Sequence, residues 1–98
     1  MTEVKKEKII PTEIKLYANY PNPFNPSTTI SFSLPSSQIV KIKVYNLLGE
    51  EVADIRNQIF SAGLNEVNFN ASGLASGVYI VSLEANTIRL SQKIALMK

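Results

Sequence analysis

The 98-residue chain contains no cysteine, no histidine and no tryptophan. Without cysteine there is no disulfide framework and no thiol chemistry. Without histidine as well, the chain lacks the commonest general base and the usual zinc ligands. No apolar run approaches the roughly 18 residues needed to span a bilayer. No signal peptide is recognisable, so an exported domain would need one on a longer parent chain.

The composition indicates a folded soluble module rather than a disordered tail, with 45% hydrophobic and 18% charged residues. A formal net charge of only +2 indicates neither nucleic acid nor an anionic membrane as a partner. The length suits one domain with a modest core. We predict a linker over residues 1–13 and a domain over residues 14–98.

The segment Asn19–Ser27, here called the hook segment, holds three prolines and three asparagines in nine positions. Each proline fixes its own φ, removes a backbone donor and pushes the preceding residue toward extended conformations. We therefore expect a stiff, bent connector that cannot run through the middle of a sheet. Tyr20 and Phe24 are the side chains expected to anchor it to a core.

Apolar residues alternate with polar ones in short stretches, with turn signals roughly every 8–12 residues. The expected strands cover residues 14–18, 28–34, 40–45, 52–55, 64–70, 78–84 and 88–96. The pattern predicts an all-β fold, a β-sandwich of about seven antiparallel strands in two sheets. Residues 78–84 carry apolar groups on both faces, so we expect a central strand there. Gly49 is expected in a hairpin turn with positive φ, and residues 56–60 form a loose connection.

The sequence predicts no enzyme, no metal site and no cofactor. Glu50 and Glu51 are adjacent, but neighbours in a strand face opposite sides of the sheet and cannot work as a pair. There is no calcium loop, no glycine loop for phosphate and no nucleophile elbow. Lys41 and Lys43 make a small basic face, for which a solubilising role is favoured over a binding patch.

Five blocks of the sequence, in order, carry a resemblance to a known family. They are Asn19–Phe32, Val44–Val52, Ala62–Gly63, Phe69–Tyr79 and Lys93–Lys98. Together they resemble the C-terminal sorting domain of the type IX secretion system, a tail found on proteins exported by Bacteroidetes and related bacteria. That family is an immunoglobulin-like β-sandwich, which agrees with the strand pattern. The resemblance implies a non-catalytic address that directs a cargo domain on the same chain through the periplasm and across the outer membrane.

The resemblance also implies partners and motif positions. The partners would be the translocon and a sortase-like protease that attaches the cargo to the cell surface, with no nucleic acid and no direct membrane insertion. The motif positions are Pro21, Asn22, Pro23, Gly77, Tyr79, Lys93, Leu96 and Lys98. We expect the machinery to recognise a folded surface and the terminal edge strand, by shape and backbone pairing rather than by charge. A core position explains Tyr79 equally well, with its ring packed and its hydroxyl bonded.

Two alternatives remain open at the level of sequence. The run of prolines in the hook segment is also similar to the immunoglobulin-like domain of flagellar hook-capping proteins. A structural spacer or a carbohydrate-binding accessory module of a secreted enzyme or adhesin is the competing class. Only Tyr17, Tyr20, Tyr45 and Tyr79 could supply sugar platforms. The terminal lysine-and-apolar ending favours the sorting domain.

Overall fold

The computed structural model describes residues 12–98, which form seven strands and no helix. The strands are β1 (Lys15–Leu16), β2 (Ser27–Leu34), β3 (Gln38–Tyr45), β4 (Glu51–Phe60), β5 (Gly63–Asn70), β6 (Gly77–Ala85) and β7 (Ile88–Leu96). The predicted all-β class is confirmed. Most of the expected linker over residues 1–13 lies outside the described residues.

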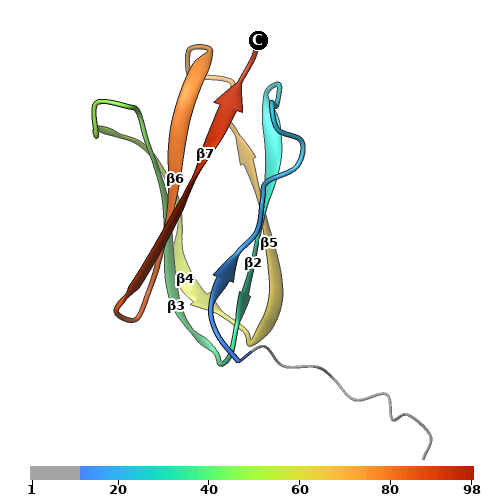
Figure 1. Cartoon of the computed structure of the whole chain (residues 1–98), viewed down its shortest axis with the longest axis vertical. Helices are drawn as coiled ribbons and strands as arrows, with labels where there is room; N and C mark the ends of the chain where they lie inside the picture. Colours follow the sequence, from blue (N-terminus) through green and yellow to red (C-terminus); the bar gives the residue numbers. More distant parts are fainter. Residues whose placement is uncertain (1–11) are drawn as a thin grey trace, which may run out of the picture.

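The strands form two sheets that face each other as a sandwich (Figure 1). The three-stranded sheet has the order β1-β2-β5, and the four-stranded sheet has the order β4-β3-β6-β7. All neighbouring strands are antiparallel. The prediction that residues 78–84 form a central strand is confirmed, because β6 lies between β3 and β7.

The core lies between the sheets and follows the alternation of the strands. Because successive side chains point to opposite faces, the apolar half of each strand faces the other sheet. The fully buried side chains at its centre are Ile30, Phe32, Leu34, Val40, Ile42, Val44, Val81 and Leu83. The predicted inward positions Val67 and Phe69 on β5 are also buried.

Strand β4 is longer than the sequence predicts. Residues 56–60 were expected to form a loose connection, but β4 continues through them to Phe60. The prediction was wrong because residues 56–59 are exposed, so no apolar alternation marks them. They belong to an edge strand that is held by backbone pairing with β3. Phe60 then turns back to the core, where its ring meets Phe32 edge-on with centroids 5.0 Å apart.

The hairpin between β3 and β4 has the predicted geometry. Gly49 adopts a φ of 88°, in the left-handed region that favours glycine. The Asn46 side chain fixes the turn, since its Oδ1 accepts the amides of Leu48 and Glu50, each at 2.9 Å. Asparagine is well suited to this role because its short side chain reaches the backbone two residues on, here the Leu48 amide, and the turn brings the Glu50 amide to the same oxygen.

The hook segment crosses from one sheet to the other. Tyr20 forms a bridge with Thr29 of β2, and Phe24 forms a parallel bridge with Leu96 of β7. The peptide bonds preceding Pro21, Pro23 and Pro26 are cis. The segment thus runs along sheet edges, as predicted, and closes one side of the sandwich.

Only one of the two predicted aromatic anchors is buried. Phe24 is 2% exposed and its ring meets Phe69 with centroids 6.2 Å apart, whereas Tyr20 is 80% exposed. The prediction for Tyr20 was wrong because its backbone pairs with β2 while its neighbour Asn19 takes the inward position. In an extended chain, adjacent side chains point to opposite sides.

Candidate functional site

The eight motif positions implied by the resemblance come from three segments that meet at one end of the sandwich, where the C-terminus emerges (Figure 1). Pro21, Asn22 and Pro23 lie in the hook segment; Gly77 and Tyr79 begin β6; Lys93, Leu96 and Lys98 lie at the end of β7 and just beyond it. Gly77 pairs with Leu96, and Lys93 pairs with Ile80, in the β6–β7 register. The hook segment is joined to the same strand by the bridge between Phe24 and Leu96.

The end of β7 is bonded on its outer edge by the hook segment. The Phe24 amide donates to the Ala95 carbonyl at 2.9 Å, and the Met97 amide donates to the Phe24 carbonyl at 2.9 Å. The Ala95 amide donates to Oδ1 of Asn22 at 3.1 Å. β7 is an edge strand, but the expectation of free backbone groups fails over residues 95–97. There the hook segment occupies the place of a neighbouring strand.

Lys98 is held against the loop between β5 and β6. Its amide donates to Oγ of Ser76 at 3.0 Å, and its Nζ donates to the Ser72 carbonyl at 2.9 Å. This loop leads directly into Gly77 and β6. The chain beyond β7 is therefore held on two sides. The hook segment bonds Met97 on one side, and the loop between β5 and β6 bonds Lys98 on the other.

Two of the eight positions belong to the core, and six face outward. Tyr79 is 8% exposed and Leu96 is 1% exposed, so neither can touch a partner while the domain stays folded. The Tyr79 hydroxyl donates to the Ala75 carbonyl at 2.6 Å, which confirms the expected packing and satisfied hydroxyl. The exposed positions are Pro21, Asn22, Pro23, Gly77, Lys93 and Lys98.

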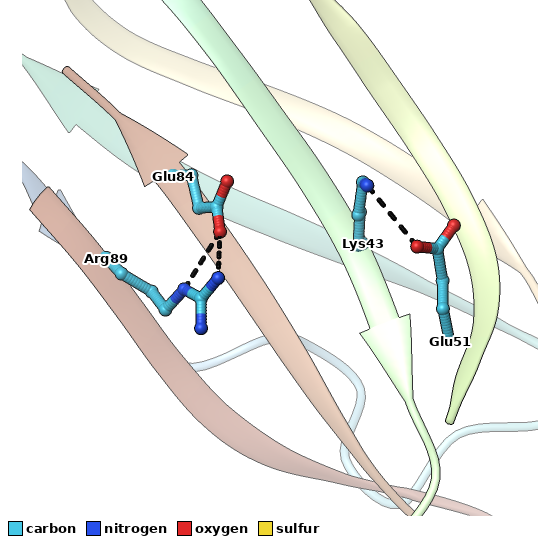
Figure 2. A network of polar contacts seen from close by, with 4 residues as sticks. All are labelled: Lys43, Glu51, Glu84 and Arg89. Carbon is cyan, nitrogen blue, oxygen red and sulfur yellow. Dashed lines mark hydrogen bonds and ion pairs between the residues drawn. The ribbon is translucent and has the colours of Figure 1, made fainter. Parts of the chain in front are cut away.

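Ion pairs occupy the outer face of the four-stranded sheet, with one pair toward each edge (Figure 2). Nζ of Lys43 lies 3.3 Å from a carboxylate oxygen of Glu51, and Nε of Arg89 donates to Glu84 at 2.9 Å. The hydrogen bond to Glu51 raises the pKa of Lys43, and the hydrogen bond from Arg89 lowers the pKa of Glu84. Lys41 pairs with Glu84 in the β3–β6 register, so the two lysines lie beside carboxylates rather than forming a bare basic patch.

The family model of the secretion system C-terminal sorting domain matches residues 18–97. The chain belongs to this family. Sorting domains of this kind are signals that direct proteins through the type IX secretion system to the cell surface or the extracellular space. Such domains interact with the secretion machinery. They are small and generally non-catalytic.

The sorting domain is also similar to part of a solved structure from Porphyromonas gingivalis. That structure comes from a study of PorZ, described as an essential bacterial surface component of the type-IX secretion system. The two share 24% identity with a TM-score of 0.60, over 85% of this chain and 11% of the PorZ chain. This likeness shows the fold. No curated protein matches the sorting domain.

An open hollow of about 300 Å³ lies on the outer face of the four-stranded sheet, beside the β3–β4 hairpin. It is lined by Tyr45, Asn46, Leu47, Gly49, Ile80, Ser82, Arg89 and Ser91. None of the eight motif positions lines it. Within residues 12–98, acidic side chains form no group that could hold a metal ion. Over the same residues, no helix could cross a membrane.

A buried polar network that the sequence did not reveal holds the bend of the sorting domain's hook segment. Nδ2 of Asn19 donates to Oγ1 of Thr28 at 2.9 Å, and the Thr28 hydroxyl donates to the Pro21 carbonyl at 2.8 Å. Gln92 of β7 donates to Oδ1 of Asn19 at 3.3 Å, which adds a second link between the hook segment and β7. Buried polar groups need such partners. No periodic pattern marks these residues, so only their contacts identify them.

Proposed function

We propose that residues 14–98 form an address that the type IX machinery recognises as a folded surface centred on the end of β7. The cargo lies on the same chain, before this domain, and the domain itself catalyses no reaction. A sortase-like protease then removes the domain and attaches the cargo to the cell surface. The sorting positions in this proposal are Pro21, Asn22, Pro23, Gly77, Tyr79, Lys93, Leu96 and Lys98.

The observation that carries the proposal is the meeting of three distant segments at one end of the sandwich. A receptor that binds a folded domain contacts one continuous surface. Backbone pairing joins the hook segment, the start of β6 and the end of β7 at this end, and six of the eight positions are exposed, which supports the proposal. Tyr79 and Leu96 contribute through the fold, because they support this end from within the core.

Recognition by shape and backbone suits this end better than recognition by charge. Lys98, one of the two lysines at this end, already donates through its Nζ to the Ser72 carbonyl, and the Glu84–Arg89 ion pair lies at the opposite end of β6 and β7. Backbone groups of Ala95 and Met97 are taken by the hook segment. Because an antiparallel ladder alternates, Ser91 and Lys93 also direct their backbone groups away from β6. A receptor strand that extends this edge would start there, upstream of the hook segment's bonds.

The direct test is a reporter with a signal peptide, fused to residues 14–98 and expressed in a host that has the type IX system. We expect the reporter at the cell surface or in the medium, and retention in the same host without the system. Retention in both hosts would contradict the proposed function. Its matched control is the reporter with the signal peptide alone.

A shorter truncation tests the terminal strand more sharply than removal of Ala95–Lys98. Deleting from Ala95 also removes the buried Leu96 and so endangers the fold. Deleting only Met97 and Lys98 keeps that core residue. We expect the shorter deletion to reduce export while circular dichroism shows an unchanged β spectrum. Normal export of the shortened reporter would contradict a role for these residues.

The carbohydrate-binding alternative has less support from the placement of the tyrosines. Tyr79 is buried, and Tyr17 bonds through its hydroxyl to Ser33 of β2 at 3.1 Å. Tyr20 lies on the hook segment, and Tyr45 lies on the outer face of the four-stranded sheet. They thus come from separate parts of the molecule rather than from one platform. A glycan pull-down with the 98-residue chain distinguishes the alternatives, since retention on a polysaccharide would favour the accessory module.

A further inference from the structure

We propose that Asn22 is a positioning residue for sorting, which holds the end of β7 so that the hook segment and the terminal strand are presented as one unit. This inference rests on the proposed function and adds a specific role for one side chain. Asn22 does not need to touch the receptor for this role. It acts on residues 95–97, which a partner reaches at the same end of the sandwich.

The hook segment bonds three successive outward backbone groups at the end of β7 and in the residue that follows it. They are the amide and the carbonyl of Ala95 and the amide of Met97. The backbone of Phe24 bonds the last two, each at 2.9 Å. The first is bonded by Oδ1 of Asn22 at 3.1 Å, so this side chain stands where the carbonyl of a neighbouring strand would stand.

The chemistry of this position favours an amide side chain. Asn22 lies between Pro21 and Pro23, neither of which carries a backbone donor. The amide oxygen of asparagine accepts a hydrogen bond as a backbone carbonyl does. Beside this contact, Phe24 and Leu96 are both buried, and the backbone bridge between them joins the hook segment to β7.

Exposure separates the role of Asn22 from that of the core. Asn22 is exposed, so its hydrogen bond competes with water and contributes little to global stability. Strand ends, however, open locally at a much lower free energy than the whole domain. Loss of this bond should therefore increase opening at Ala95 while the sandwich stays folded.

Two substitutions at one position separate the acceptor from the shape of the side chain. Asn22→Leu keeps the approximate size and removes the acceptor, whereas Asn22→Asp keeps Oδ1. Asn25→Leu is the matched control, because Asn25 is also an exposed asparagine directly before a proline of the hook segment. Among the described residues, its side chain makes no hydrogen bond to β7.

Amide hydrogen exchange, followed residue by residue by NMR on the purified chain, tests the positioning. We expect exchange at Ala95 to rise about fivefold to tenfold in Asn22→Leu, as for the loss of one hydrogen bond. Exchange at Ile94, whose amide faces β6, should not change. Asn22→Asp and Asn25→Leu should resemble the unaltered chain. Unchanged exchange at Ala95 in Asn22→Leu would overturn the proposal.

Export of the reporter fusion then tests the consequence for sorting. We expect at least a fivefold loss of export for Asn22→Leu, with near-normal export for Asn22→Asp and Asn25→Leu. Faster exchange at Ala95 with normal export would overturn the sorting role of Asn22 and leave the proposed function intact. If the unaltered domain directs no export, the proposed function falls and the sorting role of Asn22 falls with it, while the exchange result still decides whether Asn22 holds β7.

Discussion

The two edge strands of the four-stranded sheet, β4 and β7, are built in different ways. β7 buries Ile94 and Leu96 and is bonded near its end on both sides, by β6 and by the hook segment. β4 has no fully buried side chain, pairs only with β3 and shifts its register twice against it. Edge strands carry unpaired backbone groups that invite unwanted pairing.

The difference shows two ways to control an exposed edge. Along β4, register irregularities and exposed polar residues interrupt the regular ladder that another strand would need. Along the end of β7, the chain covers its own edge with a segment from far earlier in the sequence. The end of β7 is thus held by backbone hydrogen bonds on both sides, whereas β4 is paired on one side, and this difference supports the proposed place of the signal on β7.

The largest effect is expected from the side chain that fixes the cover on β7. Phe24→Ala should lower the free energy of unfolding by about 3–5 kcal/mol, because it empties a buried aromatic site. Tyr20→Ala, in the same hook segment but 80% exposed, should change it by less than about 0.5 kcal/mol. Urea denaturation of both variants measures the difference. Equal effects would mean that the hook segment is not anchored through Phe24.

A second pair of variants compares the two edges directly. Leu96→Ala on β7 should cost about 2–5 kcal/mol, since Leu96 is 1% exposed. Ile59→Ala on β4 should cost less than about 0.5 kcal/mol, since Ile59 is 68% exposed. Thermal unfolding at one pH and protein concentration reports both. A large loss for Ile59→Ala would show that the β4 edge is covered in solution.

A smaller effect is expected where the loop enters β6 beside β7. Tyr79→Phe keeps the buried ring and removes the hydrogen bond to the Ala75 carbonyl, which should cost about 0.5–1.5 kcal/mol. Tyr79→Ala also empties the ring site and should cost about 3–5 kcal/mol. Urea denaturation distinguishes the two. Equal losses would show that the hydroxyl, rather than the ring, stabilises this end.

The smallest effects are expected from the two ion pairs on the outer face of the four-stranded sheet, Lys43–Glu51 and Arg89–Glu84. The two pairs should lose their stabilising effect at opposite ends of the pH range. Arg89 lowers the pKa of Glu84, so this pair on the β7 side stabilises above the carboxylate's ordinary pKa and is lost as pH falls through the lowered value. Glu51 raises the pKa of Lys43, so the pair on the β4 side stabilises below the ordinary lysine pKa and is lost as pH rises through the raised value.

Melting temperatures of the unaltered chain and of Glu84→Gln should therefore differ slightly at neutral pH and converge in acid. The melting temperatures of the unaltered chain and of Lys43→Met should instead differ at neutral pH and converge in strong alkali. Both differences should shrink in 1 M salt, because exposed pairs are screened. A difference for Glu84→Gln that persists below the carboxylate titration would point to packing rather than charge.

The sequence predicts the strands that bury one face, but it does not predict strand segments whose side chains are all exposed. Ile30, Phe32 and Leu34 mark β2 because burial selects every second side chain. Residues 56–59 of β4 are exposed, so their side chains show no pattern that would indicate pairing with β3. Backbone pairing alone is compatible with many sequences.

The site is predicted less completely than the fold, because its central contact joins distant residues. Composition marks the hook segment, but nothing in it indicates that Asn22 bonds a residue 73 positions away. Tyr20 and Phe24 looked equivalent by hydrophobicity. Alternation places Asn19 inward and Tyr20 outward, but it would put Tyr20 and Phe24 on the same side. The bend of the hook segment between them turns Phe24 inward, and the sequence pattern does not show that bend's direction.

The separation between Asn22 and Ala95 also sets an order of events during synthesis. The hook segment leaves the ribosome early, and its partner on β7 follows 73 residues later. Pairing of β3 with β4, which are neighbours in sequence, requires no such delay. We therefore expect closure of this side of the sandwich to follow formation of the β3–β4 hairpin, because joining residues 73 positions apart costs more chain entropy than closing a short turn.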